Sequence, residues 1–215
     1  MHIPDGFLDA KTWVTLSAAS AAAVAYAARQ SSKELEERQV PLLGVLSAFI
    51  FAAQMLNFPV VAGTSGHLLG GALAAILLGP WTGAMAITAV LIIQALIFQD
   101  GGITALGANV FNMAVAGTMV TFFLYRALLR LTGKWYLAAF LAAWASVVLA
   151  AGLAGVELAI SGTSPWHLVI PAMVGIHALI GLGEAVITAA VLSAVRSLRP
   201  DLVASGLVPA QKEVA

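Results

Sequence analysis

Residues 136–160 read YLAAFLAAWASVVLAAGLAGVELAI, a stretch in which Glu157 is the only charged side chain. A helix of about 20 apolar residues crosses the hydrocarbon core of a bilayer, so this stretch is long enough to span a membrane. The whole chain has the same character, because 61% of its 215 residues are hydrophobic and 9% are charged. Soluble domains are about half apolar and about a quarter charged. We therefore expect an all-α, polytopic membrane protein.

The same length criterion divides the chain into about seven spans. We place them at 12–28, 41–58, 67–79, 81–99, 105–125, 136–160 and 167–195. The third is short, so either it is a partial span or residues 60–66 enter the membrane as irregular backbone, which requires a protein-lined cavity. We expect one domain over 1–215, with a metal-capturing segment at 1–11 and a cytoplasmic tail at 196–215.

Basic residues predict the orientation. Nine of the ten lysines and arginines fall after the first span, after the fifth span and in the tail, whereas Lys11 alone lies on the other side. Because basic residues favour the cytoplasmic side, the N-terminus is expected outside and the C-terminus in the cytoplasm of a multi-pass cell-membrane protein. Residues 1–7 lack the features of a signal peptide, so we expect the chain to begin at Met1 with a free amine.

Composition also excludes several functional classes. The formal net charge is zero, so no basic field is present to hold a nucleic acid. The sequence has no cysteine, which excludes thiolate metal sites and cysteine nucleophiles. It has no GxxxxGK[ST] motif for phosphate binding. Any ATP-driven work must therefore be done by a partner.

The first two residues indicate metal chemistry. The amine of Met1, the amide nitrogen of His2 and Nδ1 of the His2 imidazole close two fused chelate rings and place three nitrogens in one plane. A fourth nitrogen completes a square, which Ni(II) and Cu(II) favour, whereas Zn(II) prefers a tetrahedron and Mg(II) an octahedron of oxygens. Pro4 and Gly6 suit a turn that folds this segment back into the protein.

His67 is the predicted fourth ligand. It follows GTSG at 63–66, whose hydroxyl side chains can cap a helix that begins at His67. The dipole at a helix start disfavours the imidazolium and so keeps a lone pair available for a metal. His2, His67 and His167 are all expected on the outer side. The alternative explanation is that polar residues simply collect at membrane interfaces.

Polar side chains near the outer ends of the spans could orient the two imidazoles, because a metal-bound imidazole usually donates its other N–H to a partner. The candidates are Asn57, Ser65, Gln94 and Asn109. Hydrogen bonding between helices is the alternative explanation, which applies also to Gln54 and to the deeper Asn112.

The roles of four further groups stay open. Glu157, His177 and Glu184 are ionisable groups inside predicted spans, where such groups are often functional. His177 and Glu184 lie seven residues apart and nearly share a helix face, so they either bond to each other or take part in coupling. Asp100 lies in a glycine-rich loop, where it attracts cations or, as we expect, binds backbone amides of the turn.

Three motifs together resemble a known family. They are MHIPDGFL at 1–8, GTSGHLLGG at 63–71, and QAL at 94–96 followed by DGG at 100–102 and ALGAN at 105–109. The pattern covers essentially the whole chain and resembles the NikM/CbiM family, the substrate-binding (S) subunits of energy-coupling-factor transporters for nickel and cobalt.

The resemblance implies a seven-helix S-component in which Met1, His2 and His67 hold the metal. It also implies separate ATPase subunits, a transmembrane coupling subunit and a small additional membrane subunit as partners. The Ile-Pro-Asp-Gly start is more similar to the nickel branch, so Ni(II) is the expected cargo and Co(II) the alternative. No cofactor is expected.

Two other classes are open. A stand-alone channel or secondary carrier would move metal without an ATPase, although the odd span count and the lack of a visible repeat argue against a carrier. An intramembrane serine protease could use Ser65 as nucleophile and His177 as base. In our placement Ser65 lies at the outer mouth and His177 lies about 15 Å deeper, which argues against a dyad. We therefore expect a high-affinity transport subunit and not an enzyme.

Overall fold

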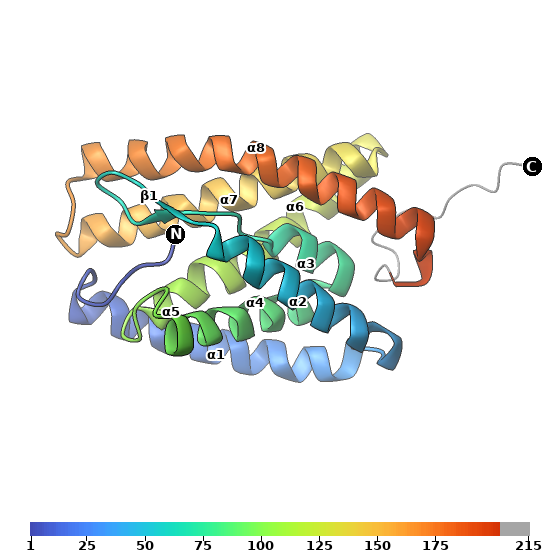
Figure 1. The fold of residues 1–215 in the computed structure, drawn as a ribbon, viewed down its shortest axis with the longest axis horizontal. Helices are drawn as coiled ribbons and strands as arrows, with labels where there is room; N and C mark the ends of the chain where they lie inside the picture. Colours follow the sequence, from blue (N-terminus) through green and yellow to red (C-terminus); the bar gives the residue numbers. More distant parts are fainter. Residues whose placement is uncertain (203–215) are drawn as a thin grey trace, which may run out of the picture.

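A computed structural model describes residues 1–202 as a bundle whose long helices lie roughly along one common axis (Figure 1). The long helices are α1 (Ala10–Glu34), α2 (Val40–Met55), α4 (Pro80–Ile93), α6 (Gly117–Thr132), α7 (Trp135–Ile160) and α8 (Trp166–Leu198). Shorter elements are α3 (Gly71–Leu78), α5 (Leu106–Asn109), the π-helices η2 (Gln94–Phe98) and η3 (Val110–Ala116), the 3-10 helices η1 (Glu37–Gln39) and η4 (Pro200–Leu202), and strands β1 (Phe58–Pro59) and β2 (Ser65–Gly66). The predicted cytoplasmic tail lies outside the described residues from position 203 onward.

Among residues 1–202 the predicted number of seven helices is correct, because α4 continues into η2, and α5 continues through η3 into α6. Within the described range, five helical stretches are long and apolar enough to cross a membrane: Glu37–Met55, Pro80–Phe98, Leu106–Thr132, Trp135–Ile160 and Trp166–Leu198. The third predicted span is indeed short, since α3 has 8 residues and rises only about 12 Å.

Helix α1 has the length of a span but a more polar composition. Two of its polar side chains are used in packing. Ser20 Oγ donates to the carbonyl of Gly107 at 2.6 Å, and Ser31 Oγ bonds Thr82 Oγ1 at 2.9 Å. These contacts hold α1 against α5 and α4, whereas its charged side chains are exposed.

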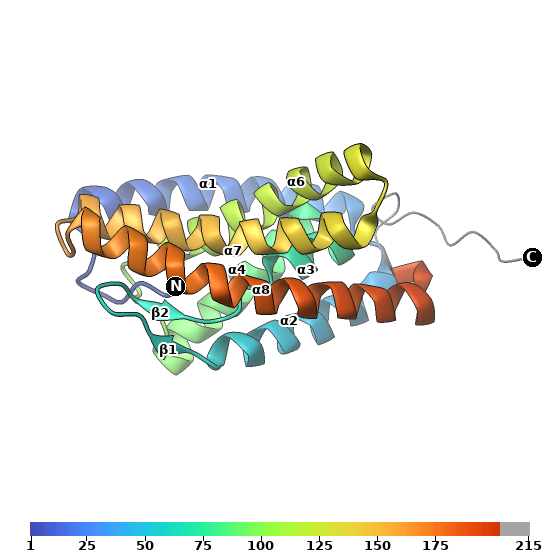
Figure 2. The ribbon, with the colours of Figure 1, turned by 90° about the horizontal axis from the view of Figure 1, so that it is seen from above.

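The segment between α2 and α3 enters the bundle. Strands β1 and β2 form a short antiparallel hairpin with Phe58 opposite Gly66 and Pro59 opposite Ser65. Figure 2 shows this hairpin beside α8 and next to the N-terminus. Helix α3 is therefore short, as predicted, and non-helical backbone precedes it.

The N-terminal segment also turns back into the bundle. Gly6 has φ of 81°, a left-handed conformation that glycine adopts without a steric penalty. Beyond this turn, the side chains of Met1 and Ile3 are completely buried. The turn predicted from Pro4 and Gly6 is thus confirmed, and it brings the chain terminus against the hairpin.

Gly107 marks a close approach between α5 and α1. A Cβ at Gly107 would lie 2.4 Å from the Cα of Ser17. We expect Gly107→Ala to force the helices apart and to lower the free energy of unfolding by about 1–3 kcal/mol, measured as a lower Tm in detergent. Gly44→Ala in α2 is the matched control, because no atom lies within 4 Å of its Cβ. An equal loss in both variants would contradict this close packing.

Candidate metal centre

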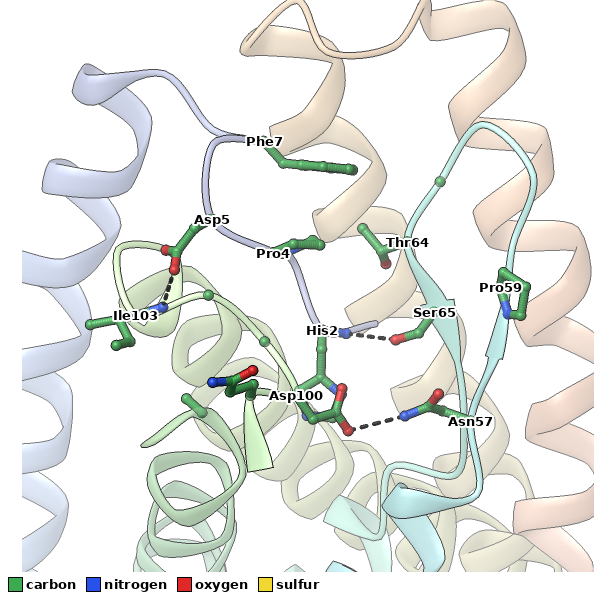
Figure 3. A pocket seen from close by; sticks show the side chains of 15 residues that line it. His2, Pro4, Asp5, Phe7, Asn57, Pro59, Thr64, Ser65, Asp100 and Ile103 are labelled. Carbon is green, nitrogen blue, oxygen red and sulfur yellow. Dashed lines mark hydrogen bonds and ion pairs between the residues drawn. The ribbon is translucent and has the colours of Figure 1, made fainter. Parts of the chain in front are cut away.

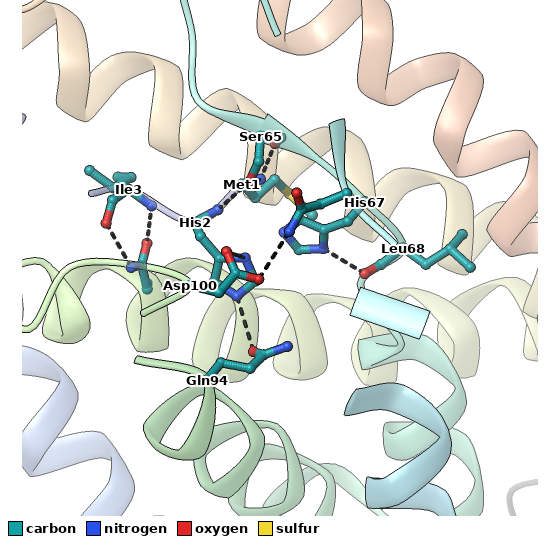
Figure 4. Close-up of polar contacts among 10 residues, drawn as sticks. Met1, His2, Ile3, Ser65, His67, Leu68, Gln94 and Asp100 are labelled. Atoms are coloured by element: carbon teal, nitrogen blue, oxygen red, sulfur yellow. Dashed lines mark hydrogen bonds and ion pairs between the residues drawn. The ribbon is translucent and has the colours of Figure 1, made fainter. Parts of the chain in front are cut away.

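The fold brings Met1, His2 and His67 together from two distant parts of the chain (Figure 4). The imidazole rings of His2 and His67 stack with centroids 4.4 Å apart and planes 22° apart. Both residues are buried, at 4% and 1% exposure, and the amine of Met1 is enclosed beside them. The three residues predicted as metal ligands therefore form one buried cluster.

Hydrogen bonds assign the tautomer of each ring. His2 Nε2 lies 3.1 Å from Gln94 Oε1, and His67 Nδ1 lies 2.7 Å from the carbonyl oxygen of Leu68. Both oxygens only accept, so the proton belongs on His2 Nε2 and on His67 Nδ1. The remaining nitrogens, His2 Nδ1 and His67 Nε2, are buried and have no hydrogen-bond partner within residues 1–202. Two bare imidazole lone pairs therefore lie in the same small region.

Burial lowers the pKa of all three groups and so favours their neutral forms. Desolvation, with a smaller effect of the nearby amine in the same direction, lowers the pKa of His2 to about 3. The pKa of His67 is well below its usual value because of burial, with the amine and His2 acting in the same direction. Burial likewise lowers the pKa of the Met1 amine well below 8.0, against the opposing effect of the Asp100 carboxylate. Neutral nitrogens are the forms that bind a metal.

Ser65 holds the two main-chain nitrogens. The Met1 amine donates to Ser65 Oγ at 2.9 Å and also to the Ser65 carbonyl oxygen. The backbone N–H of His2 donates to the same Oγ at 3.2 Å. Ser65 therefore fixes the amine and the amide beside the imidazoles, and it contacts the main chain where an imidazole contact was predicted.

Of the other three candidates, one contacts an imidazole ring and two do not. Gln94 orients His2, as predicted. Asn109 instead binds the backbone of Ile3 through two hydrogen bonds of 2.8 and 3.1 Å. Asn57 Nδ2 donates to Asp100 Oδ2 at 3.0 Å and so contacts neither imidazole. Asp100 also differs from the prediction, because its carboxylate faces Asn57 and His2 and not the amides of its own turn.

Asp5 anchors the N-terminal segment, a role that the sequence analysis missed. Its carboxylate accepts hydrogen bonds from the backbone N–H of Ile103 at 3.1 Å and of Thr104 at 2.7 Å. The only sequence signal was the Asp-Gly pair, which is typical of a turn and does not reveal a partner about 100 positions away.

The predicted helix start at His67 is wrong. Helix α3 begins at Gly71, and residues 67–70 are not helical. Ser65 belongs to β2 and does not cap a helix. Desolvation, and not a helix dipole, is therefore what keeps the His67 ring neutral.

One face of α8 instead supports the segment that carries His67. A Cβ at Gly63 would lie 2.5 Å from Met173 Sδ, and a Cβ at Gly66 would lie 2.9 Å from Ile180 Cδ1. Only glycine fits against α8 at these two positions without displacing a neighbour. The GTSG sequence thus has a packing role that the capping interpretation did not anticipate.

Glu184 lies one turn beyond Ile180 on the same face. Its carboxylate accepts the backbone N–H of Leu69 and, at 2.9 Å, that of Gly70. Gln54 Nε2 donates to the carbonyl of Leu69 at 2.7 Å. The irregular backbone after His67 is therefore satisfied by buried side chains, as membrane-embedded backbone requires.

The histidine that lies near His67 is His177 and not His167. His167 is exposed at the start of α8. His177 is fully buried and close enough to His67 and the Met1 amine to interact with both electrostatically. Its Nδ1 contacts the carbonyl of Met173 at 2.7 Å, so the possible hydrogen-bonded pair of His177 and Glu184 does not form.

The protease dyad is not formed among the described residues, and Glu157 is hydrogen-bonded to a neighbouring helix. Ser65 Oγ accepts from the Met1 amine and the His2 amide, and within residues 1–202 no hydrogen bond joins this hydroxyl group to His177. The Ser65 main chain nevertheless lies close to the His177 ring, so the expected separation of about 15 Å is wrong. Asn112 Nδ2 donates to Glu157 Oε2 at 2.7 Å, which supports the interhelical explanation for Asn112. In the same range, no group of three or more His, Cys, Asp or Glu side chains is placed to hold a metal ion.

Residues 2–202 match the family described as the cobalt uptake substrate-specific transmembrane region, CbiM. The chain belongs to the CbiM family. It is 45% identical over its whole length to a putative fused nickel transport protein NikMN of Archaeoglobus fulgidus, covering 72% of that protein. It is 34% identical to a cobalt transport protein CbiM of Sorangium cellulosum, over 94% of each chain.

Comparison with solved structures also finds a metal transporter. A crystal structure of a transition metal transporter superposes with a TM-score of 0.88 at 34% identity, covering 92% of this chain and 93% of the other. As a CbiM-family member, the chain is a multi-pass membrane protein of a nickel and cobalt uptake family and a transport protein, which confirms the expectation that it is not an enzyme.

Glu184→Gln tests the support of the His67 segment in this CbiM-family chain. Glutamine keeps one acceptor oxygen and turns an N–H₂ group toward the second backbone donor, which leaves a buried N–H unpaired at a cost of about 1–3 kcal/mol. We expect faster amide hydrogen exchange at Leu69 and Gly70, measured by mass spectrometry in detergent. Thr188→Val, one turn further along α8, is the control. Equal protection in Glu184→Gln and the wild-type chain would contradict the assignment.

Proposed function

We propose that this chain captures Ni(II) as the substrate-binding subunit of an ATP-driven uptake transporter. The proposed ligands are the Met1 amine, the His2 amide nitrogen and Nδ1, and His67 Nε2. One observation carries the proposal. His2 Nδ1 and His67 Nε2 are buried and have no hydrogen-bond partner among the described residues, and they lie beside the Met1 amine and the His2 amide. Their partners already use the opposite nitrogen of each ring, as in established metal sites.

Nickel fits this donor set better than zinc does. The amine, amide and imidazole of the first two residues close fused rings in one plane, and planar nitrogen coordination favours Ni(II) or Cu(II) over Zn(II). Co(II) is the alternative cargo, since relatives named for nickel and for cobalt both match the chain. No cofactor belongs to the proposal.

Metal binding must break the hydrogen bonds that Ser65 now accepts from the Met1 amine and the His2 amide. The ion takes the position along the His2 amide N–H direction, so the Ser65 hydroxyl has to rotate away as the amide loses its proton. Ser65 thus places the main-chain nitrogens before the ion arrives without being a ligand. A cavity of about 620 Å³, lined by His2, Ser65 and Asp100 among others, leads to the cluster (Figure 3).

The proposed orientation places this cavity outside the cell, because the basic residues favour the opposite side as cytoplasmic. Uptake then needs ATPase subunits and a transmembrane coupling subunit, with a small additional membrane subunit as a further partner. A stand-alone channel or carrier would instead move Ni(II) in vesicles that contain this chain alone. That transport assay separates the two classes.

Acetylating the Met1 amine tests the chelate directly. Every side chain survives, but the blocked nitrogen has no lone pair for a metal, so we expect nickel affinity in isothermal titration to fall by more than the roughly 100-fold that losing an outer-shell partner can cost. Met1→Ala, with its terminal amine left free, is the matched control because it keeps the amine, amide and imidazole in the same order. Wild-type affinity in the acetylated chain would refute the ligand set.

Nickel affinity should depend on pH in a defined way. Burial lowers the pKa of both imidazoles and of the Met1 amine, which favours the neutral forms that bind a metal. The His2 amide must lose its proton in every case, so Kd should rise by about tenfold or more for each pH unit lost near neutrality. Where the amine is protonated, a second proton competes and the slope should approach about 100-fold per unit. A pH-independent Kd would contradict amide coordination.

A further inference from the structure

A carboxylate stands at the inner wall of the cavity beside the proposed ligands. Asp100 Oδ1 lies 3.4 Å from His2 Nδ1, and the exposed fractions of the two side chains are 16% and 3%. Its other oxygen, Oδ2, accepts a hydrogen bond from Asn57 Nδ2 at 3.0 Å. Asp100 therefore touches both the cavity and a buried imidazole, and Asn57 fixes its orientation.

The contact between Asp100 and His2 has no proton to share. Gln94 Oε1 places the ring proton on Nε2, so Nδ1 presents a lone pair toward a carboxylate oxygen. Two electron-rich atoms at this distance repel each other unless a cation lies close to both. Within the described residues, His2 Nδ1 has no hydrogen-bond partner that could relieve the repulsion.

The oxygens of Asp5, the other carboxylate that lines the cavity, are already used in hydrogen bonds. Asp5 is engaged by the backbone N–H groups of Ile103 and Thr104 and by the Thr104 hydroxyl. Its oxygens serve to hold the N-terminal segment. Asp100 Oδ1, by contrast, lies beside the lone pair of His2 Nδ1, and it is the cavity carboxylate oxygen available to an arriving ion.

We propose that Asp100 Oδ1 and His2 Nδ1 form an encounter site for a hydrated divalent cation on its way to the four-nitrogen centre. This inference rests on the proposed function. The ion exchanges water molecules for one carboxylate oxygen and one imidazole nitrogen, neither of which has to lose a proton. It then moves onto the Met1 amine and the His2 amide, whose proton passes to solvent, and it releases Asp100 while keeping His2 Nδ1.

The encounter site has a broader specificity than the final centre. One oxygen and one nitrogen donor suit most first-row divalent ions, Zn(II) included. Planar binding with a deprotonated amide suits Ni(II), so discrimination between metal ions occurs when the ion moves from the encounter site to the four-nitrogen centre. The carboxylate also adds a local attraction for cations, which accelerates association and weakens as ionic strength rises.

Stopped-flow measurement of Ni(II) binding to the full-length chain in detergent tests the proposal with Asp100→Asn. Because arrival and departure use the same route, we expect the association and dissociation rate constants to fall together, by about tenfold or more. The association rate should also lose most of its dependence on salt. Asp9→Asn is the matched control, since Asp9 caps α1 and its substitution removes the same charge outside the cavity.

Several outcomes would overturn the encounter site. Equal association rates in Asp100→Asn and Asp9→Asn would show that only the general field matters. A faster dissociation rate with unchanged association would make Asp100 a permanent ligand. A second measurement needs no variant: millimolar Zn(II) should slow Ni(II) association in the wild-type chain, and no slowing would equally refute the site. Failure of the proposed function looks different, because the wild-type chain would then retain no Ni(II) at equilibrium.

Discussion

The free amine of Met1 lies buried at one end of a helical bundle, and the rest of the site follows from that constraint. A buried amine must be neutral or paired, and here burial lowers its pKa while Ser65 accepts its hydrogens. The same placement brings the first amide and the first imidazole of the chain beside His67. A metal centre can thus be built from a chain terminus in a protein without cysteine.

Each part of this centre is held from a different helix. Gln94, at the start of the π-helix η2, orients His2, while Asn109, at the end of α5, binds the backbone of Ile3. Helix α8 supports the His67 segment through Glu184 and through the close contact of Ile180 with Gly66. Irregular backbone within a membrane bundle needs such partners, since lipid offers no hydrogen bonds. The binding geometry and the packing of α8 are therefore mechanically linked.

The local features of the site could be predicted because they depend on neighbours in the chain. Helix positions follow from apolar length, and the chelate that we propose for Met1 and His2 follows from their order alone. The turn at Gly6 is equally local. His67 was mispredicted as a helix start, because GTSG suits a cap as well as it suits close contact with α8. Likewise, no local pattern indicated that His177 is buried beside His67 whereas His167 is exposed.

The amino-acid sequence by itself determined the membrane class, the seven helices and the chelating order of the first two residues, since composition, periodicity and covalent connectivity are written along the chain. Only the tertiary structure decided which imidazole nitrogens are bare and which carboxylates face them. Gln94 and His2 lie 92 positions apart, and Leu69 and Glu184 lie 115 apart. Contacts over such separations arise from helix packing, which fixes tautomers and carboxylate partners that no local pattern records.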